Sequence, residues 1–219
     1  MKNLEYLEIQ SSDNIDSSVI WLHGLGADGY DFEPVVHELG MPSTRFILPH
    51  APYRPVTLNN GYEMRAWYDI LGLSIGTPQD EKGITECSQQ IESLIGMEMS
   101  RGIPGNKIIL AGFSQGGAMA LHTAIRFTER LGGILGLSTY LPLSSHVAKE
   151  RSKENQAIPI FIAHGTFDTV IELSRCKQSM DVLEQLNYSL EFHEYAMAHS
   201  LCKQEIGDIR NFLIKNLGS

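Results

Sequence analysis

Ser114 lies in the middle of Gly112-Phe113-Ser114-Gln115-Gly116-Gly117, a segment that joins two stretches of different character. The apolar run 108–111 before it predicts a buried parallel strand, and residues 118–125 after it are good helix formers. A Gly-x-Ser-x-Gly turn between a strand and a helix is typical of a nucleophile elbow, which lifts the serine hydroxyl off the sheet edge. We therefore predict that Ser114 is a nucleophile; the alternative is a serine that merely occupies a glycine turn.

A serine nucleophile needs a histidine base, and that base needs an acid to orient it. On a parallel sheet these groups follow the carboxyl ends of strands, in the chain order serine, acid, histidine. Asp168 follows the apolar run 158–163, whereas Asp181 and Asp208 fall inside predicted helices. We predict Asp168 as the acid; its alternative role is to cap the next helix.

Eight histidines compete for the role of the base. His199 lies downstream of the acid, between a predicted strand that ends at Tyr195 and the last helix. His193 falls within that strand, and His164 precedes the acid, where we expect it to hold the loop by a hydrogen bond. We predict His199 as the base and expect kcat/KM to rise with pH as its imidazole loses a proton.

An oxyanion formed at Ser114 needs two preorganised backbone N–H donors. The residue after an elbow nucleophile supplies one of them, here Gln115. The second is expected from the Trp-Leu-His-Gly-Leu-Gly run 21–26, where a strand enters a glycine loop, and we predict the N–H of Leu25. A plain glycine turn is the alternative for this run.

The elements that must position these residues alternate along the chain. We predict strands at 4–8, 18–22, 45–48, 108–111, 134–137, 158–163 and 189–195. We predict helices at 32–39, 81–100, 118–125 and 175–185, and a closing helix marked by apolar residues at 206, 209, 213 and 217. Residues 50–79 carry several prolines and glycines and are expected to form a long functional excursion without a regular element. The alternation predicts one α/β domain over 1–219, with a mostly parallel sheet covered by helices on both faces.

Composition limits the class of protein. The chain has 219 residues, 42% hydrophobic and 20% charged, which is ordinary for a soluble globular protein. Its formal net charge of -9 argues against nucleic acid as a partner. No apolar run is long enough for a transmembrane segment, and acids near the start argue against a signal peptide. Cys87, Cys176 and Cys202 are widely spaced and odd in number, so we expect free thiols, no metal site and a cytoplasmic location.

Several blocks in order give the chain a family resemblance. They are His-Gly-Leu-Gly-Ala-Asp at 23–28, Pro-His-Ala-Pro at 49–52, Trp-Tyr-Asp-Ile at 67–70, the elbow at 112–117, His-Gly at 164–165 with Asp168, and His-Ser at 199–200. With these blocks the sequence resembles the small carboxylesterases and acyl-protein thioesterases of the phospholipase/carboxylesterase family, in the α/β-hydrolase superfamily. The resemblance implies the same triad and oxyanion hole. It also implies hydrolysis of carboxylic esters or thioesters, of short-to-medium or long acyl chains, through an acyl-enzyme on Ser114 without a cofactor.

The resemblance further implies a groove for an acyl chain, formed by Trp67, Leu71, Leu73, Ile75 and Leu141. From the residues alone, the alternating leucines and isoleucine indicate either an acyl-binding flap or an edge strand, and the same side chains could contact a membrane or a second copy in a homodimer. The expected partners are small-molecule or lipid acyl esters and S-acylated proteins. A lysophospholipase-type lipid esterase, a peptidase or lipase, and a non-catalytic ligand-binding protein on the hydrolase scaffold stay open as alternatives.

Overall fold

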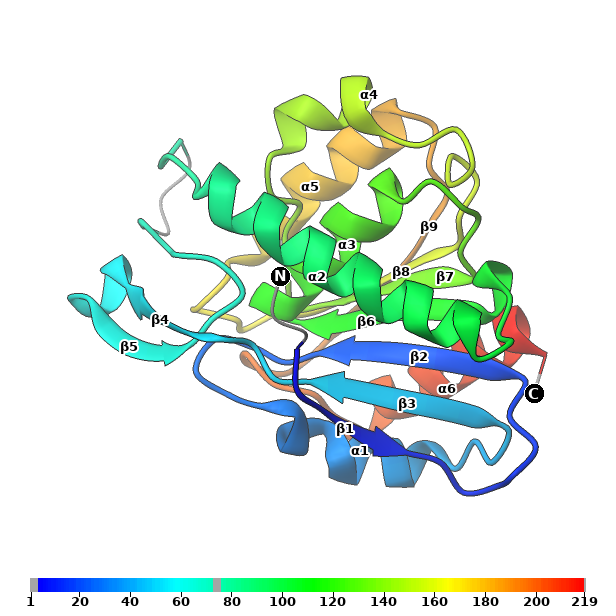
Figure 1. Ribbon diagram of the computed structural model, residues 1–219. Helices are drawn as coiled ribbons and strands as arrows, with labels where there is room; N and C mark the ends of the chain where they lie inside the picture. Colours follow the sequence, from blue (N-terminus) through cyan, green and yellow to red (C-terminus); the bar gives the residue numbers. More distant parts are fainter. Residues whose placement is uncertain (1–3, 73–75, 219) are drawn as a thin grey trace.

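A seven-stranded β-sheet forms the centre of the computed structural model, which describes residues 4–72 and 76–218 (Figure 1). Across the sheet the strands run in the order β1-β3-β2-β6-β7-β8-β9. β1 pairs antiparallel with β3, and the neighbouring pairs from β3 to β9 are parallel. The strands are β1 (Tyr6–Ile9), β2 (Ser17–Leu22), β3 (Thr44–Pro49), β6 (Ile108–Phe113), β7 (Gly133–Leu137), β8 (Ile160–Gly165) and β9 (Leu190–Tyr195).

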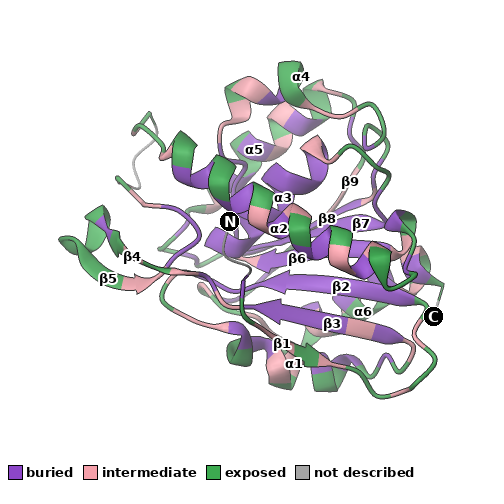
Figure 2. Cartoon of the chain, in the orientation of Figure 1, coloured by how far each residue is buried: buried purple, intermediate pink, exposed green. Residues whose placement is uncertain are grey.

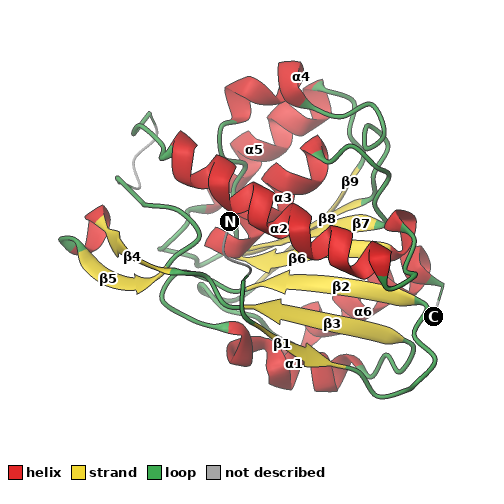
Figure 3. Cartoon of the chain, in the orientation of Figure 1, coloured by secondary structure: helices red, strands yellow, loops and turns green. Residues whose placement is uncertain are grey.

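Helices cover both faces of this sheet (Figure 3). On one face α1 and α6 contribute Val36 and Leu213 to one apolar cluster. On the other face α2, α3 and α5 contribute Ile91, Leu121 and Leu183 to a second cluster. The helices are α1 (Glu33–Leu39), α2 (Glu81–Ser100), α3 (Gln115–Arg126), α4 (Val147–Glu150), α5 (Leu173–Gln185) and α6 (Lys203–Leu217), with short 3-10 turns at Gly29–Phe32, Thr57–Asn59, Gly105–Lys107 and Ser144–His146. No helix in the described part of the chain has the length and apolar character needed to cross a membrane.

The central strands are buried on both faces, as Figure 2 shows. In β2, Val19 and Trp21 belong to the cluster under α1 and α6, whereas Ile20 and Leu22 belong to the cluster under α2 and α3. This alternation follows from the two-residue period of a strand. It explains why these strands appear in the sequence as continuous apolar runs and not as alternating ones.

The order in which successive strands are added to the sheet reverses between the neighbouring strands β2 and β6. β2 is followed by β3 on one side, and β6 is followed by β7 on the other. In an open α/β sheet the loops that leave two such strands diverge to opposite faces, and a crevice forms between them at the carboxyl edge. Register pairs Leu22 with Gly112, so the loops after β2 and β6 begin side by side. Both predicted sources of oxyanion donors lie in these two loops.

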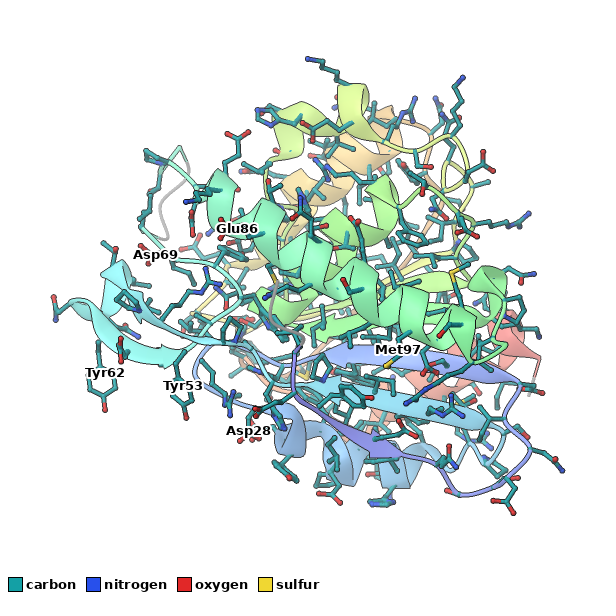
Figure 4. The ribbon with its side chains drawn as sticks, in the orientation of Figure 1. Asp28, Tyr53, Tyr62, Asp69, Glu86 and Met97 are labelled. Atoms are coloured by element: carbon teal, nitrogen blue, oxygen red, sulfur yellow. The ribbon has the colours of Figure 1, made fainter. Side chains whose placement is uncertain are left out.

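Residues 50–79 contain a β-hairpin, so the expectation of no regular element there is wrong. β4 (Tyr53–Val56) pairs antiparallel with β5 (Tyr62–Arg65), and the hairpin projects beyond the carboxyl ends of β2 and β3 (Figure 1). Proline within β4 and glycine in the turn hid these short strands, because both residues usually interrupt strands. The side chains of Tyr53 and Tyr62 extend away from the hairpin and are 66% and 71% exposed (Figure 4).

The predicted order of the other elements is confirmed, with small differences at their ends. α2 begins where the acids at its start predicted it, since the Asp80 carboxylate accepts a hydrogen bond from the Gly83 N–H at 2.9 Å. β8 begins at Ile160 and not at Ile158. Pro159 between them has no N–H to donate to a neighbouring strand, although its carbonyl accepts from Ile134. The one-turn helix α4 was not predicted.

Candidate active site

The elbow glycines are required by close contact between backbones. A Cβ atom on Gly112 would lie 2.3 Å from the carbonyl carbon of Gly116, and one on Gly116 would lie 2.2 Å from the carbonyl oxygen of Leu22. Ser114 itself has φ 55° and ψ -120°, a conformation that costs free energy for a residue with a side chain. The surrounding backbone holds it there: the Ser114 N–H donates to Leu137 O at 2.8 Å, and its carbonyl accepts from Thr139 Oγ1 at 2.7 Å.

Asp168 and His199 lie in two different loops at the carboxyl edge and are hydrogen-bonded to each other. His199 Nδ1 lies 2.7 Å from Asp168 Oδ2. The other oxygen, Oδ1, accepts from the N–H groups of Val170 and Ile171, both at 2.9 Å. The imidazole of His199 also contacts the ring of Phe113, the residue before Ser114, with centroids 4.7 Å apart. An aspartate that accepts from Nδ1–H leaves Nε2 of this histidine available as a base.

His164 is hydrogen-bonded to the loop that carries Asp168. Its Nε2 lies 2.8 Å from the carbonyl oxygen of Ile171 and 3.4 Å from Asp168 Oδ2. A carbonyl can only accept, so Nε2 carries the proton. Burial lowers the pKa of His164, which favours the neutral imidazole. The expected hydrogen bond from His164 to its loop is confirmed.

The other candidates lie elsewhere. Asp181 and Asp208 fall within α5 and α6, as predicted. Asp208 accepts a hydrogen bond from the Tyr195 hydroxyl at 2.8 Å. His193 stacks on Phe161 of the neighbouring strand, with centroids 4.9 Å apart, so its ring lies against the sheet.

The glycine loop after β2 lies directly against the elbow. A Cβ on Gly24 would be 3.5 Å from Ser114 Cβ, and the neighbouring Leu25 is half-buried. His23 fixes the start of this loop: its Nε2 accepts from the Ala51 N–H at 3.0 Å, so Nδ1 carries the proton and donates to Gly24 O at 2.7 Å. Burial lowers the pKa of His23 to about 4, which keeps this tautomer uncharged near neutral pH.

The side chain of Gln115 has a structural role that the sequence did not reveal. Its side-chain Oε1 accepts from the Trp67 N–H at 2.9 Å, and its Nε2 donates to Tyr68 O at 2.7 Å. The Trp67 indole N–H in turn donates to His23 O at 2.8 Å. These bonds tie the elbow, the glycine loop and the segment after β5 into one unit. Nothing in the sequence pairs a glutamine with a backbone segment 48 residues away.

The residues expected to form the acyl groove differ in exposure. Trp67 is completely buried, so in this structure its indole offers no surface to a substrate and instead positions the loop. Leu141 is 3% exposed and Leu71 is 41% exposed. Leu73 and Ile75 lie outside the described residues.

The segment that carries Leu71 is anchored by Asp69, which Figure 4 labels near the start of α2. The Asp69 carboxylate accepts from the N–H and the hydroxyl of Thr57 at 2.7 and 2.6 Å. Its backbone N–H donates to Asp80 Oδ2 at 2.9 Å. The hairpin, this segment and the first turn of α2 are therefore connected through two carboxylates. Neither was predicted as a site residue, although the Trp-Tyr-Asp-Ile block contains one of them.

A parallel sheet, a strained serine between strand and helix, and an aspartate–histidine pair at the same edge define the α/β-hydrolase class. Comparison with known proteins agrees: a family model described as Phospholipase/Carboxylesterase matches residues 4–217. The chain belongs to this family and is a serine hydrolase that acts on ester bonds, of the acyl-protein thioesterase and carboxylesterase type. Acyl esters are the substrates that this membership implies.

Relatives of known identity match nearly the whole chain. An acyl-protein thioesterase 1 of Yarrowia lipolytica is 39% identical over 209 residues, 92% of each chain. An acyl-protein thioesterase 1 of Cryptococcus neoformans is 36% identical and covers 98% of each. Among solved structures, Zea mays acyl-protein thioesterase 2 superposes with a TM-score of 0.90 at 28% identity, covering 98% of this chain and 99% of that one. The resemblance found in the sequence is confirmed.

Proposed function

We propose that Ser114 is the nucleophile, His199 the general base and Asp168 the residue that orients the base. The observation that carries this proposal is the 2.7 Å contact between His199 Nδ1 and Asp168 Oδ2 beside the ring of Phe113, the residue next to Ser114. Because Nδ1 is bonded to Asp168, Nε2 is the nitrogen of His199 that is available to accept the proton of Ser114. It also joins residues that lie 31 positions apart in the sequence.

The reaction then has two halves. In the first, Ser114 Oγ bonds to the acyl carbon while its proton passes to His199 Nε2, and the carbonyl oxygen becomes an oxyanion. The N–H groups of Leu25 and Gln115 stabilise this oxyanion, each contributing on the order of a hundredfold in rate. His199 next gives the proton to the departing alcohol or thiol, and the acyl-enzyme remains. Water repeats the cycle and releases the acid.

The relatives named acyl-protein thioesterase support an S-acylated protein as one substrate. The family description Phospholipase/Carboxylesterase supports small acyl esters and lysophospholipids as others. Leu71 supports an apolar entrance, since it is exposed on a segment whose neighbours Trp67 and Tyr68 are bonded to Gln115. The same exposed leucine could meet a membrane surface or a second copy of the chain. Three free cysteines are consistent with the proposed cytoplasmic location.

The test is Ser114→Ala, assayed with matched octanoyl ester and thioester substrates and labelled with a fluorophosphonate. We expect loss of both turnover and labelling with an unchanged circular dichroism spectrum, because the alanine removes the attacking oxygen and little else. Ser138→Ala is the matched control: Ser138 follows the neighbouring strand β7, is also at positive φ (46°) and is buried. Retained turnover in Ser114→Ala, or equal loss in Ser138→Ala, would contradict the assignment.

A further inference from the structure

The side chain of Phe113 contacts two parts of the candidate active site. Its ring centroid lies 4.7 Å from that of the His199 imidazole, and the two ring planes are tilted by 45°. On the glycine loop after β2, a Cβ atom added to Gly24 would lie 3.3 Å from Phe113 Cδ1, so the loop backbone passes close to the ring. Phe113 therefore meets both the proposed base and the loop from which one oxyanion donor is expected.

The position of this ring follows from the strand that carries it. Phe113 is the last residue of β6, and it packs against the apolar cluster under α1 and α6, to which the residue two positions earlier also belongs. Leu201, in the loop that enters α6, packs against the same cluster. The backbone of Phe113 pairs with Leu137 of β7, and the next N–H, that of Ser114, donates to Leu137 O at 2.8 Å. The ring is thus attached to a fixed backbone directly beside the nucleophile.

Two contacts hold the imidazole of His199. Its Nδ1 lies 2.7 Å from Asp168 Oδ2, but a single hydrogen bond leaves a ring free to turn about the axis of that bond. The contact with Phe113 lies off this axis and restricts the turning. In the proposed mechanism His199 becomes a cation during attack, and a cation within about 6 Å of an aromatic centroid is attracted to the ring. The phenylalanine is therefore placed both to orient the imidazole and to favour its charged form.

We propose that Phe113 is a positioning residue for the reaction, which holds the His199 imidazole ready to accept the proton of Ser114 and stabilises the imidazolium that forms. Phe113 acts through His199 and exchanges no proton itself. The inference rests on the proposed function, because it requires His199 to be the base.

Two ionisable groups lie near this imidazole. Asp168 is bonded to it directly, and the Nε2 of His164 lies 3.4 Å from the same carboxylate oxygen. Both groups stay in place when residue 113 or residue 32 is replaced. A difference in pH dependence between such variants therefore reports on the aromatic contact.

The experiment compares Phe113→Leu, which keeps an apolar side chain but removes the aromatic ring, with Phe113→Tyr, which retains the ring. The first readout is the second-order rate at which a fluorophosphonate labels Ser114 between about pH 5 and pH 9, because labelling requires the attack step and no deacylation. The second readout is kcat and KM for a neutral nitrophenyl ester. Circular dichroism shows whether each variant is folded, and Phe113→Met takes the place of the leucine variant if that one is not.

We expect Phe113→Leu to lower the labelling rate and kcat about tenfold, with KM within about threefold of wild type, because the imidazole loses its second contact. The midpoint of the pH profile should move about half a unit toward lower pH, since an imidazolium that has lost a favourable contact releases its proton more readily. Phe113→Tyr should keep the wild-type midpoint and most of the rate.

Phe32→Leu is the matched control, because it makes the same change on a neighbouring ring. The ring of Phe32 contacts Trp21 and Phe113, with centroids 5.2 and 6.2 Å apart, and it is buried. The variant should therefore melt at a lower temperature, as replacements in a core do, while the midpoint of its pH profile stays at the wild-type value.

A slower Phe113→Leu enzyme with an unmoved midpoint would overturn the proposal and assign Phe113 to packing alone. An unchanged labelling rate would overturn it as well, and so would an equal shift of the midpoint in Phe113→Tyr or Phe32→Leu. Failure of the proposed function has a different signature: Ser114 is not labelled in the wild type, or His199→Ala is labelled as fast as the wild type.

Discussion

The carboxylate of Asp168 has hydrogen-bond partners at both oxygens. Two backbone N–H groups reach Oδ1 and His199 reaches Oδ2, with the Nε2 of His164 at 3.4 Å from the same oxygen. These bonds fix the position of the carboxylate, which in the proposed mechanism orients the imidazole and stabilises the imidazolium that forms during attack. His164 is a positioning residue in this arrangement, because it acts through the loop that carries the acid.

Replacing His164 tests this role. We expect His164→Leu to lower kcat/KM about tenfold, because Ile171 O, in the loop that carries Asp168, loses a buried donor. His164→Gln places an amide N–H near the former Nε2 position and should recover most of the activity. The measurement is steady-state kinetics on a neutral ester, with thermal melting to compare stability. If glutamine is as damaging as leucine, the donor is not what matters at this position.

At the scale of elements, three segments far apart in the sequence meet around the elbow. The first residue of α3 holds the segment after β5, and that segment holds the loop after β2. The carboxyl edge of the sheet brings these loops together, since β2 and β6 are neighbours in register. The oxyanion donors proposed here come from two of the three segments, so their geometry depends on the third.

Gln115→Met tests this connection, because it removes two side-chain hydrogen bonds and leaves the backbone N–H in place. Trp67 N–H and Tyr68 O would remain buried without their partner, which costs about 1–3 kcal/mol for each. We expect a lower melting temperature, a lower kcat/KM and a shift of the Trp67 fluorescence as its segment loosens. Gln185→Met, in the last turn of α5 and exposed, is the matched control. Wild-type stability and fluorescence in Gln115→Met would show that the segment is held by packing alone.

At the scale of the whole molecule, burial on both faces of the sheet also encloses ionisable groups. Glu205, in the first turn of α6, is 0% exposed, and burial raises its pKa from 4.5 to about 8. The folded protein therefore holds this proton more tightly than the unfolded chain does. The stabilisation from the protonated carboxyl is complete below about pH 4.5 and is lost as the pH rises through about 8.

Glu205→Gln, which imitates the protonated form, should remove this pH dependence. We expect the variant and the wild type to melt at similar temperatures near pH 5, and the variant to melt at progressively higher temperatures than the wild type toward pH 9. Thermal melting across that range is the measurement. Glu184→Gln removes the same charge from an exposed position and should show no such divergence. Parallel curves for wild type and Glu205→Gln would show that the carboxyl ionises without cost.

Much of the candidate site could be predicted because it depends on local chain chemistry. Short stretches of sequence are enough to recognise the elbow glycines and the apolar strands. They are also enough to place Asp168 and His199 after two successive strands. The hairpin at 53–65 was missed because proline and glycine usually argue against strands, and here cross-strand pairing outweighs that preference. The place of Trp67 was missed for a different reason: an aromatic residue in a loop can face either the substrate or the core, and the sequence does not distinguish the two.

The sequence by itself determined the order of elements, the class of fold and the types of reactive side chain, since periodicity and turn chemistry act over a few residues. The tertiary structure decided which distant groups meet. It placed the Gln115 side chain on Trp67 and Tyr68, His164 under the acid loop, and Arg175 against Tyr140. These contacts join residues from separate strands and helices, and their energies depend on register and burial that exist only after the sheet has formed.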